Sequence, residues 1–207
     1  MNTTTTEAIQ EEEPFIPYAD PAQAPDYLKK LLDPYMERMG FLPNALKLYI
    51  HRPEIAEILW QLNNRVMRDP SSTLDQRLKR ELGSVASKLN KCKYCTSHHT
   101  AILQNPANQA MEGWGMGDDE VQALLGGEWK PANAMERACF EFVIEATTDS
   151  GKVSEETYEE LKKNLTPEQI IELAAVVGFW KMYNTIHQSL RVPLEARLFE
   201  VAKKTGL

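Results

Sequence analysis

Several features of other protein classes are missing from this chain of 207 residues. No apolar run approaches the roughly 18 residues of a membrane-spanning helix, and the longest candidate, residues 170–179, contains Glu172. Positive charge is in deficit, because 23 lysines and arginines stand against 30 aspartates and glutamates. The net charge of -7 argues against the basic patch of a nucleic-acid-binding protein. The sequence therefore predicts neither a membrane partner nor a nucleic-acid partner.

Cysteine is also scarce. Two of the three cysteines, Cys92 and Cys95, are separated by only two residues, which is unlike the disulfide framework of a small secreted protein. The N-terminus shows no basic segment followed by an apolar run, so no signal peptide is expected. We therefore expect a cytoplasmic protein, in a reducing compartment where a C-x-x-C pair is more often catalytic than structural.

Strand-like alternation of apolar and polar residues is absent over any useful length. From residue 21 onward, apolar residues recur instead at helical spacing. The expected helices cover residues 26–39, 44–50, 53–67, 74–89, 90–105, 120–125, 134–148, 154–163 and 166–190, and a last one ends at Lys203. The prediction is an all-α fold, a compact array of antiparallel helices with short connections. We expect a single domain over residues 21–207, preceded by a flexible arm over residues 1–20 that is rich in Thr and Glu.

Local signals mark several helix ends. Ser72 or Thr73 is expected to cap the helix over residues 74–89. Residues 166–169, Thr-Pro-Glu-Gln, combine a cap, a proline in the first turn and a capping-box glutamine. Gly83 and its small neighbours would let another helix approach closely, or leave room beside a site.

The reactive groups are concentrated between Asn90 and His99. At about 100° per residue, Cys92, Cys95 and His99 share one helix face, whereas His98 lies to the side. We therefore expect His99 to touch both sulfurs. Asn90 is a good N-cap residue, so both thiols are expected in a first turn, where free N–H groups and the helix dipole favour an anion. In such a setting the thiol pKa falls from about 8.5 to between about 3.5 and 7.5. This pattern predicts an activated thiolate with a second thiol in reach to form a disulfide.

Two alternatives stand beside this redox dithiol. The pair and a histidine form part of a zinc site in some proteins, but no second C-x-x-C follows to complete it, and no metal or cofactor is expected. The thiols could also be inert. Cys139 lies on the apolar face of residues 134–148 and is expected to be a buried small hydrophobe without a role.

Several segments together resemble the carboxymuconolactone decarboxylase superfamily, and within it the alkyl hydroperoxidase D-like (AhpD-like), peroxidase-related proteins. They are residues 40–44, 74–82, 92–100 with the C-x-x-C-x-x-x-H pattern, 166–173, Asn184 and Val192-Pro193. The resemblance covers about residues 21–197. It implies the AhpD-like helical fold and a thiol peroxidase with antioxidant activity, assembled as a homo-oligomer (a dimer, trimer or hexamer).

The resemblance also implies roles for single residues. Cys95 would attack a small alkyl hydroperoxide, and Cys92 would resolve the sulfenic acid to a redox-active disulfide. His99 would relay the proton together with an upstream glutamate. A thiol or dithiol reductant protein would restore the pair. Tyr94, between the cysteines, stands where the hydroperoxidases carry a histidine.

The upstream glutamate is Glu81, which lies one residue closer to Cys92 than in the family pattern. On a continuous helix this shift rotates the carboxylate by about 100°, and Arg80 takes the nominal place. Glu81 is either the relay acid or a solvated charge beside Arg77 and Arg80.

Two histidines and three other activities complete the possibilities. His98 is expected at the surface or at an interface, and His187 in the core or at the border of a pocket. Besides the peroxidase, the chain could exchange disulfides with a partner protein or act as a decarboxylase or isomerase of lactone-like acids. It could also be a non-enzymatic metal-binding or assembly module.

Overall fold

The computed structural model describes residues 13–106 and 112–207, and in this part of the chain it contains helices and turns but no strand. The elements are η1 (Pro21–Gln23), α1 (Asp26–Met39), α2 (Asn44–Tyr49), α3 (Pro53–Met67), α4 (Gln76–Leu89), α5 (Lys93–Gln104), α6 (Asp118–Gly126), α7 (Ala134–Thr148), α8 (Glu155–Asn164), α9 (Pro167–Ser189), η2 (Ala196–Leu198) and α10 (Phe199–Lys204). The predicted all-α class is confirmed. Among the described residues, no helix combines the length and apolarity needed to cross a membrane. The first twelve residues of the expected arm lie outside the described part.

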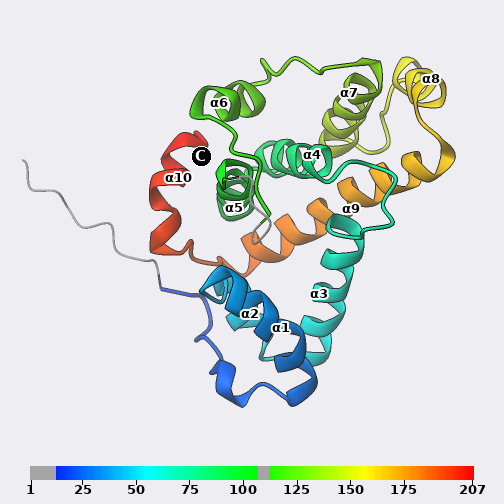
Figure 1. Cartoon of the computed structure of the whole chain (residues 1–207). Helices are drawn as coiled ribbons and strands as arrows, with labels where there is room; N and C mark the ends of the chain where they lie inside the picture. Colours follow the sequence, from blue (N-terminus) through cyan, green and yellow to red (C-terminus); the bar gives the residue numbers. More distant parts are fainter. Residues whose placement is uncertain (1–12, 107–111) are drawn as a thin grey trace, which may run out of the picture.

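Helices α4 and α5 occupy the middle of the fold (Figure 1). Helix α4 contacts α5, α6, α7 and α9, and α5 in turn contacts α6 and α10. Helices α1, α2 and α3 form a group of their own, which α3 joins to the rest through contacts with α9 and α4. The long helix α9 contacts α3, α4, α5 and α7, so it brings residues from the end of the chain beside the central pair.

Most helix ends follow the sequence signals. At the start of α9, Thr166 and Gln169 form the expected capping box. The cap of α4 differs from the expectation, because Asp75 accepts the hydrogen bond of the Leu78 N–H at 3.1 Å. The Ser72 hydroxyl is engaged elsewhere and donates to Glu172 of α9 at 2.6 Å. Helix α4 therefore begins two residues later than expected and is tied to α9 by the side chain that was expected to cap it.

Because Gly83 has no side chain beyond its hydrogen atom, helices α4, α5 and α9 can approach one another closely at this position. A Cβ atom at this position of α4 would lie 2.4 Å from Trp180 Nε1 of α9 and 2.6 Å from His99 Cε1 of α5. Such distances are too short for a real contact. Gly83 therefore permits the close approach that the sequence analysis anticipated, and it does so beside the candidate site.

Candidate redox site

Cys92 and Cys95 lie together at the start of α5. Cys92 is the N-cap residue of this helix, and its Sγ lies 3.5 Å from the Cys95 N–H nitrogen, which donates to it. The two Sγ atoms are 2.9 Å apart, both thiols are free, and the residues are only 1% and 2% exposed. The expected arrangement of two thiols at a helix N-terminus is therefore present. The expected cap is wrong, because Asn90 ends α4 and Cys92 itself is the N-cap of α5.

An imidazole from another helix completes the dithiol. His187 Nδ1 of α9 lies 3.0 Å from Cys95 Sγ. The ligand atoms of Cys92, Cys95 and His187 all lie within 4.8 Å of one another. Burial lowers the pKa of His187 below its ordinary value, so its ring is neutral and able to accept a proton. Of the two expectations for His187, the place at a pocket border is confirmed.

The pKa values of the two thiols are shifted in opposite directions. The hydrogen bond with Cys95, and then the imidazole of His187, lower the pKa of the Cys92 thiol to about 5 although burial opposes this. Burial and the adjacent Cys92 raise the pKa of the Cys95 thiol well above its ordinary value. At neutral pH the pair therefore holds one proton and one negative charge. The charge lies mainly on Cys92, where the N-terminus of α5 favours an anion.

His99 does not make the predicted contact with the sulfurs. Its ring packs edge-on against Trp180 at a centroid distance of 4.1 Å, and neither ring nitrogen has a hydrogen-bond partner among the described residues. The helical-wheel argument fails at Cys92, which has non-helical backbone angles (φ -87°, ψ 89°). His99 is buried and lines the same pocket as Cys95, so its role as a relay stays a prediction.

Arg80, and not Glu81, faces the pocket, as the one-residue shift in the sequence implied. Glu81 is buried and accepts a hydrogen bond from Arg77 Nε at 2.7 Å, and it is not among the residues that line the pocket. The sequence analysis offered a solvated charge beside Arg77 as the alternative to a relay acid. Glu81 does lie beside Arg77, but it is buried and not solvated. Arg80 lines the pocket and pairs with Glu112. The one-residue shift therefore turns an arginine toward the site, and a relay role for Glu81 remains untested.

A buried acid that the sequence analysis missed is Glu195, just before η2. Its carboxylate accepts hydrogen bonds from the Asn44 N–H at 2.6 Å and from the Tyr94 hydroxyl at 3.0 Å, and it pairs with His98 Nε2 at 2.8 Å. Burial alone would raise the pKa of Glu195, but the charge and hydrogen bond of His98 lower it to about 2. His98 is therefore part of the site's surroundings. The only sequence signal was the Val192-Pro193 segment shortly before Glu195.

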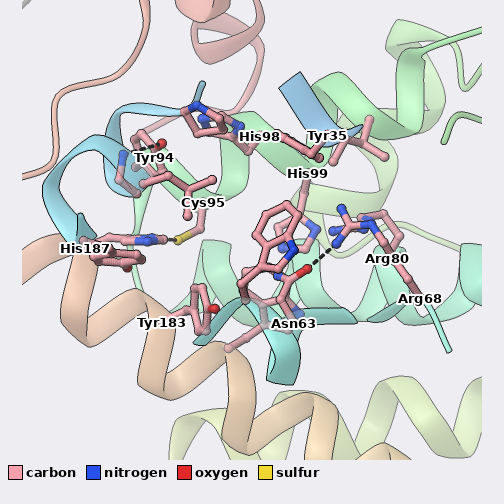
Figure 2. Close-up of a pocket in the computed structure, with 17 residues that line it drawn as sticks. Tyr35, Asn63, Arg68, Arg80, Tyr94, Cys95, His98, His99, Tyr183 and His187 are labelled. Atoms are coloured by element: carbon pink, nitrogen blue, oxygen red, sulfur yellow. Dashed lines mark hydrogen bonds between the residues drawn. The ribbon is translucent and has the colours of Figure 1, made fainter. Parts of the chain in front are cut away.

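The dithiol opens into a pocket with a volume of about 100 Å³ (Figure 2). Cys95 lines the pocket, whereas Cys92 is not among its described lining residues. Six of the 17 lining residues are tyrosines or tryptophans: Tyr35, Tyr49, Trp60, Tyr94, Trp180 and Tyr183. This volume is comparable with the ~150 Å³ of an engineered cavity that binds benzene. The pocket therefore has room for one small organic molecule, which would meet Cys95 first.

A metal ion would find an incomplete site here. Cys92, Cys95 and His187 are a three-ligand group of suitable type. A structural zinc site uses four protein ligands. Among the described residues no fourth cysteine, histidine or carboxylate joins this group, so the arrangement fits redox chemistry of the thiols better than a structural metal.

No protein-family model and no curated protein matches this chain. Solved structures match it in fold. The debrominase Bmp8 is 22% identical, with a TM-score of 0.74 over 91% of this chain and 96% of that one. A Cys-to-Ala variant of Bmp8 in complex with 2,3,4-tribromopyrrole also matches, at 20% identity and a TM-score of 0.76, covering 95% of this chain and 100% of that one.

Two peroxidase-related proteins have the same fold. One, from Ralstonia eutropha and described as an alkylhydroperoxidase AhpD core, is 19% identical, with a TM-score of 0.77 over 92% of this chain and 96% of that one. The other, from Silicibacter sp., is 24% identical, with a TM-score of 0.74 over 90% and 95%. The chain therefore has the AhpD-like helical fold that the resemblance implied.

Proposed function

We propose that the protein is a thiol-dependent oxidoreductase that reduces a small organic hydroperoxide with the Cys92/Cys95 pair. One observation carries the proposal: the free thiol of Cys95 lies at a pocket wall, 2.9 Å from the free thiol of Cys92 and 3.0 Å from Nδ1 of the His187 imidazole. A thiolate is the species that attacks an O–O bond. The AhpD-like fold of peroxidase-related proteins supports the same activity.

In the first step, Cys95 Sγ gives its proton to His187 Nδ1 and attacks the peroxide. The S–O bond forms as the O–O bond breaks, and the departing alkoxide takes the proton from His187 and leaves as an alcohol. Cys95 is assigned this step because it faces the pocket. The proton move is needed because the pKa of Cys95 is raised.

In the second step, the Cys92 thiolate attacks the sulfenic acid of Cys95. The S–S bond forms, the S–O bond breaks, and hydroxide leaves and takes a proton from solvent to form water. The low pKa of Cys92 keeps this thiol ready for the reaction. A thiol or dithiol reductant protein then restores both thiols by disulfide exchange. The attacking sulfur thus faces the substrate, and the resolving sulfur lies behind it.

A second candidate activity is reductive debromination of a small halogenated ring. The aromatic pocket wall and the fold shared with Bmp8 favour it. One thiolate would take the bromine as an S–Br bond while the ring carbon takes a proton. The second thiolate would then displace bromide and form the same disulfide.

Homo-oligomer formation also stays a proposal. Ile55, Ile58 and Leu62 lie on α3 and are exposed. A row of large apolar side chains on one helix is typical of a contact surface between protein chains. Sedimentation of the purified chain tests the expected dimer, trimer or hexamer.

The decisive experiment counts thiols. Reduced protein receives one equivalent of tert-butyl hydroperoxide, and free thiols and remaining peroxide are measured for the native chain, C95S, C92S and the control C139S. We expect the native chain and C139S to lose two thiols per peroxide. C95S should react with no peroxide, whereas C92S should stop at a sulfenic acid that dimedone traps.

Other results would select another activity. Release of bromide from 2,3,4-tribromopyrrole without peroxide consumption would select debromination. Loss of thiols only with an oxidised disulfide donor would select disulfide exchange. Reaction of C95S at the native rate would contradict the assignment of the two sulfurs.

A further inference from the structure

The pocket has two chemically different ends (Figure 2). Cys95 and His187 lie at one side of the view, and Arg68 and Arg80 lie at the other. His99 lies between the two ends, and Trp180 packs against it. The peroxide chemistry uses only the thiol end and gives the two arginines no task.

The arginine end carries an excess of positive charge. Arg80 Nε donates to Glu112 Oε1 at 3.1 Å, and Arg68 Nε donates to Glu112 Oε2 at 3.0 Å. One carboxylate thus serves two guanidinium groups, and no aspartate or glutamate is among the described residues that line the pocket. Arg80 is almost completely buried, at 2% exposure, so water screens its charge poorly. The two guanidinium groups and the one carboxylate therefore leave a net charge of about +1 at this end of the pocket.

Polar atoms without partners lie next to this charge. Trp180 Nε1 and both ring nitrogens of His99 are buried and have no hydrogen-bond partner among the described residues. Burial, and then Arg80, lower the pKa of His99 well below its ordinary value, so its ring is neutral. Buried polar atoms cost free energy when they stay unpaired. Both side chains line the pocket, and Trp180 Nε1 also lies against Gly83 of α4. The unpaired His99 ring is the polar group nearest to Arg80 that could donate to an acceptor group of a ligand.

Arg68 also connects the pocket with the outside. Its side chain is 21% exposed, and it lines both the inner pocket and a neighbouring surface hollow that contains Arg65 and Asn64. The Asn63 carboxamide oxygen accepts a hydrogen bond from Arg68 Nη1 and holds the guanidinium at this border. The hollow also contains Asp69, which pairs with Arg65, so Arg68 is the cation there that is shared with the lining of the inner pocket.

We propose that the pocket takes a small substrate with a carboxylate group, bound at the Arg68/Arg80 end, and that this contact presents the reactive end of the substrate to Cys95. The proposal rests on the dithiol activity proposed above and names its substrate class. A carboxylate fits because it is a monoanion that matches a single excess charge and accepts two hydrogen bonds from a guanidinium fork. The volume of about 100 Å³ fits a small molecule rather than a long chain.

Binding of an unreactive pair of ligands tests this without any redox step. Propionate and propionamide have the same shape and differ in charge. Each is titrated into reduced protein, and the fluorescence of the pocket tryptophans, with protection of Cys95 from iodoacetamide, reports binding. We expect the native chain to bind propionate at least tenfold more tightly than propionamide.

Charge variants locate the effect. R68M leaves Arg80 and Glu112 as a one-to-one pair, so the preference for propionate should fall at least tenfold, whereas R68K should keep most of it. The matched control is R65M, because the Arg65 side chain is 79% exposed in the outer hollow and does not line the pocket. E112Q removes the shared carboxylate and should increase the preference, which keeps the test decisive if R68M does not fold.

Equal affinity of the native chain for the two ligands would overturn the proposal. So would a preference that survives R68M, or one that R65M removes equally. None of these results depends on the thiol count with peroxide, so failure of the substrate class and failure of the dithiol activity are distinguishable.

Discussion

At the scale of single residues, the site depends on how one proton is divided between two sulfurs. The pKa of Cys92 is lowered, mainly by its hydrogen bond with Cys95, and the pKa of Cys95 is raised, so we expect the charge on Cys92 and the proton on Cys95. Cys139, in contrast, has its pKa raised to about 12 by burial. Of the three cysteines, only the pair at the start of α5 is arranged to ionise at neutral pH.

A pH titration of reduced protein at 240 nm tests this division. Since the pKa of Cys92 is lowered to about 5, thiolate absorbance should appear with a midpoint near pH 5 and be complete at pH 7. In C95A the hydrogen bond is lost, so the midpoint should move up toward the ordinary value of about 8.5. C139A is the control and should titrate like the native chain. A native midpoint above pH 8 would contradict the charge division.

The residues of the pair were predictable from the sequence, but their partners were not. Two cysteines three positions apart and a helix start are local signals. His187 lies 92 positions from Cys95 and reaches it only because α9 packs beside α5. Glu195 lies 97 positions from His98 and is equally remote in sequence. His99 was placed by a helical period that does not extend back to Cys92.

At the scale of elements, the site exists because α4, α5 and α9 approach closely at Gly83. The bounds of the helices agreed with those predicted from the sequence within a few residues. Capping residues such as Thr166 bond to backbone N–H groups within one helical turn, so they can be recognised from the local sequence. The predicted cap of α4 is wrong, because Asp75 caps the helix and the Ser72 hydroxyl bonds to Glu172 of α9 instead. Local signals therefore predict where helices lie, and tertiary contacts decide which side chains are left for capping.

Substitution of Gly83 tests the close approach. In G83A the added methyl group would overlap Trp180 and His99, so we expect a loss of about 1–3 kcal/mol in the free energy of unfolding. Urea unfolding measures the change. The control is G178A in α9, where a Cβ atom meets nothing within 4 Å. Alanine there should stabilise the helix by up to about 1 kcal/mol. Equal stability of the two variants would show that the contact at Gly83 is not tight.

At the scale of the whole molecule, Glu195 joins parts that are far apart in the chain. Its carboxylate bonds to Asn44 at the start of α2 and to Tyr94 and His98 of α5. The N-terminal helix group, the dithiol helix and the C-terminal segment therefore meet at one buried charge. In the sequence only the nearby Val192-Pro193 segment pointed to this region, and it did not mark Glu195 itself.

The pH dependence of unfolding tests this junction. The pKa of Glu195 is lowered from 4.5 to about 2, so its contribution is complete above pH 4.5 and is lost as the pH falls toward 2. The loss amounts to at most about 3 kcal/mol. Urea unfolding at pH 5 and pH 3 should show a smaller difference for E195Q than for the native chain. E200Q, whose carboxylate is exposed, serves as the control and should retain the native difference.

The burial of both sulfurs has a consequence for timing. Cys92 and Cys95 are 1% and 2% exposed, and the pocket in front of them admits only small molecules. An oxidant of a few atoms can enter the pocket at once. The active-site cysteine of a large electron donor cannot reach the Cys92–Cys95 disulfide while the helices stay packed. Recovery would then wait for a transient separation of α5 from its neighbours, and its rate would level off as donor is added. The protein would stay oxidised after the oxidant has gone, and the rate at which α5 separates from its neighbours would set how long this lasts.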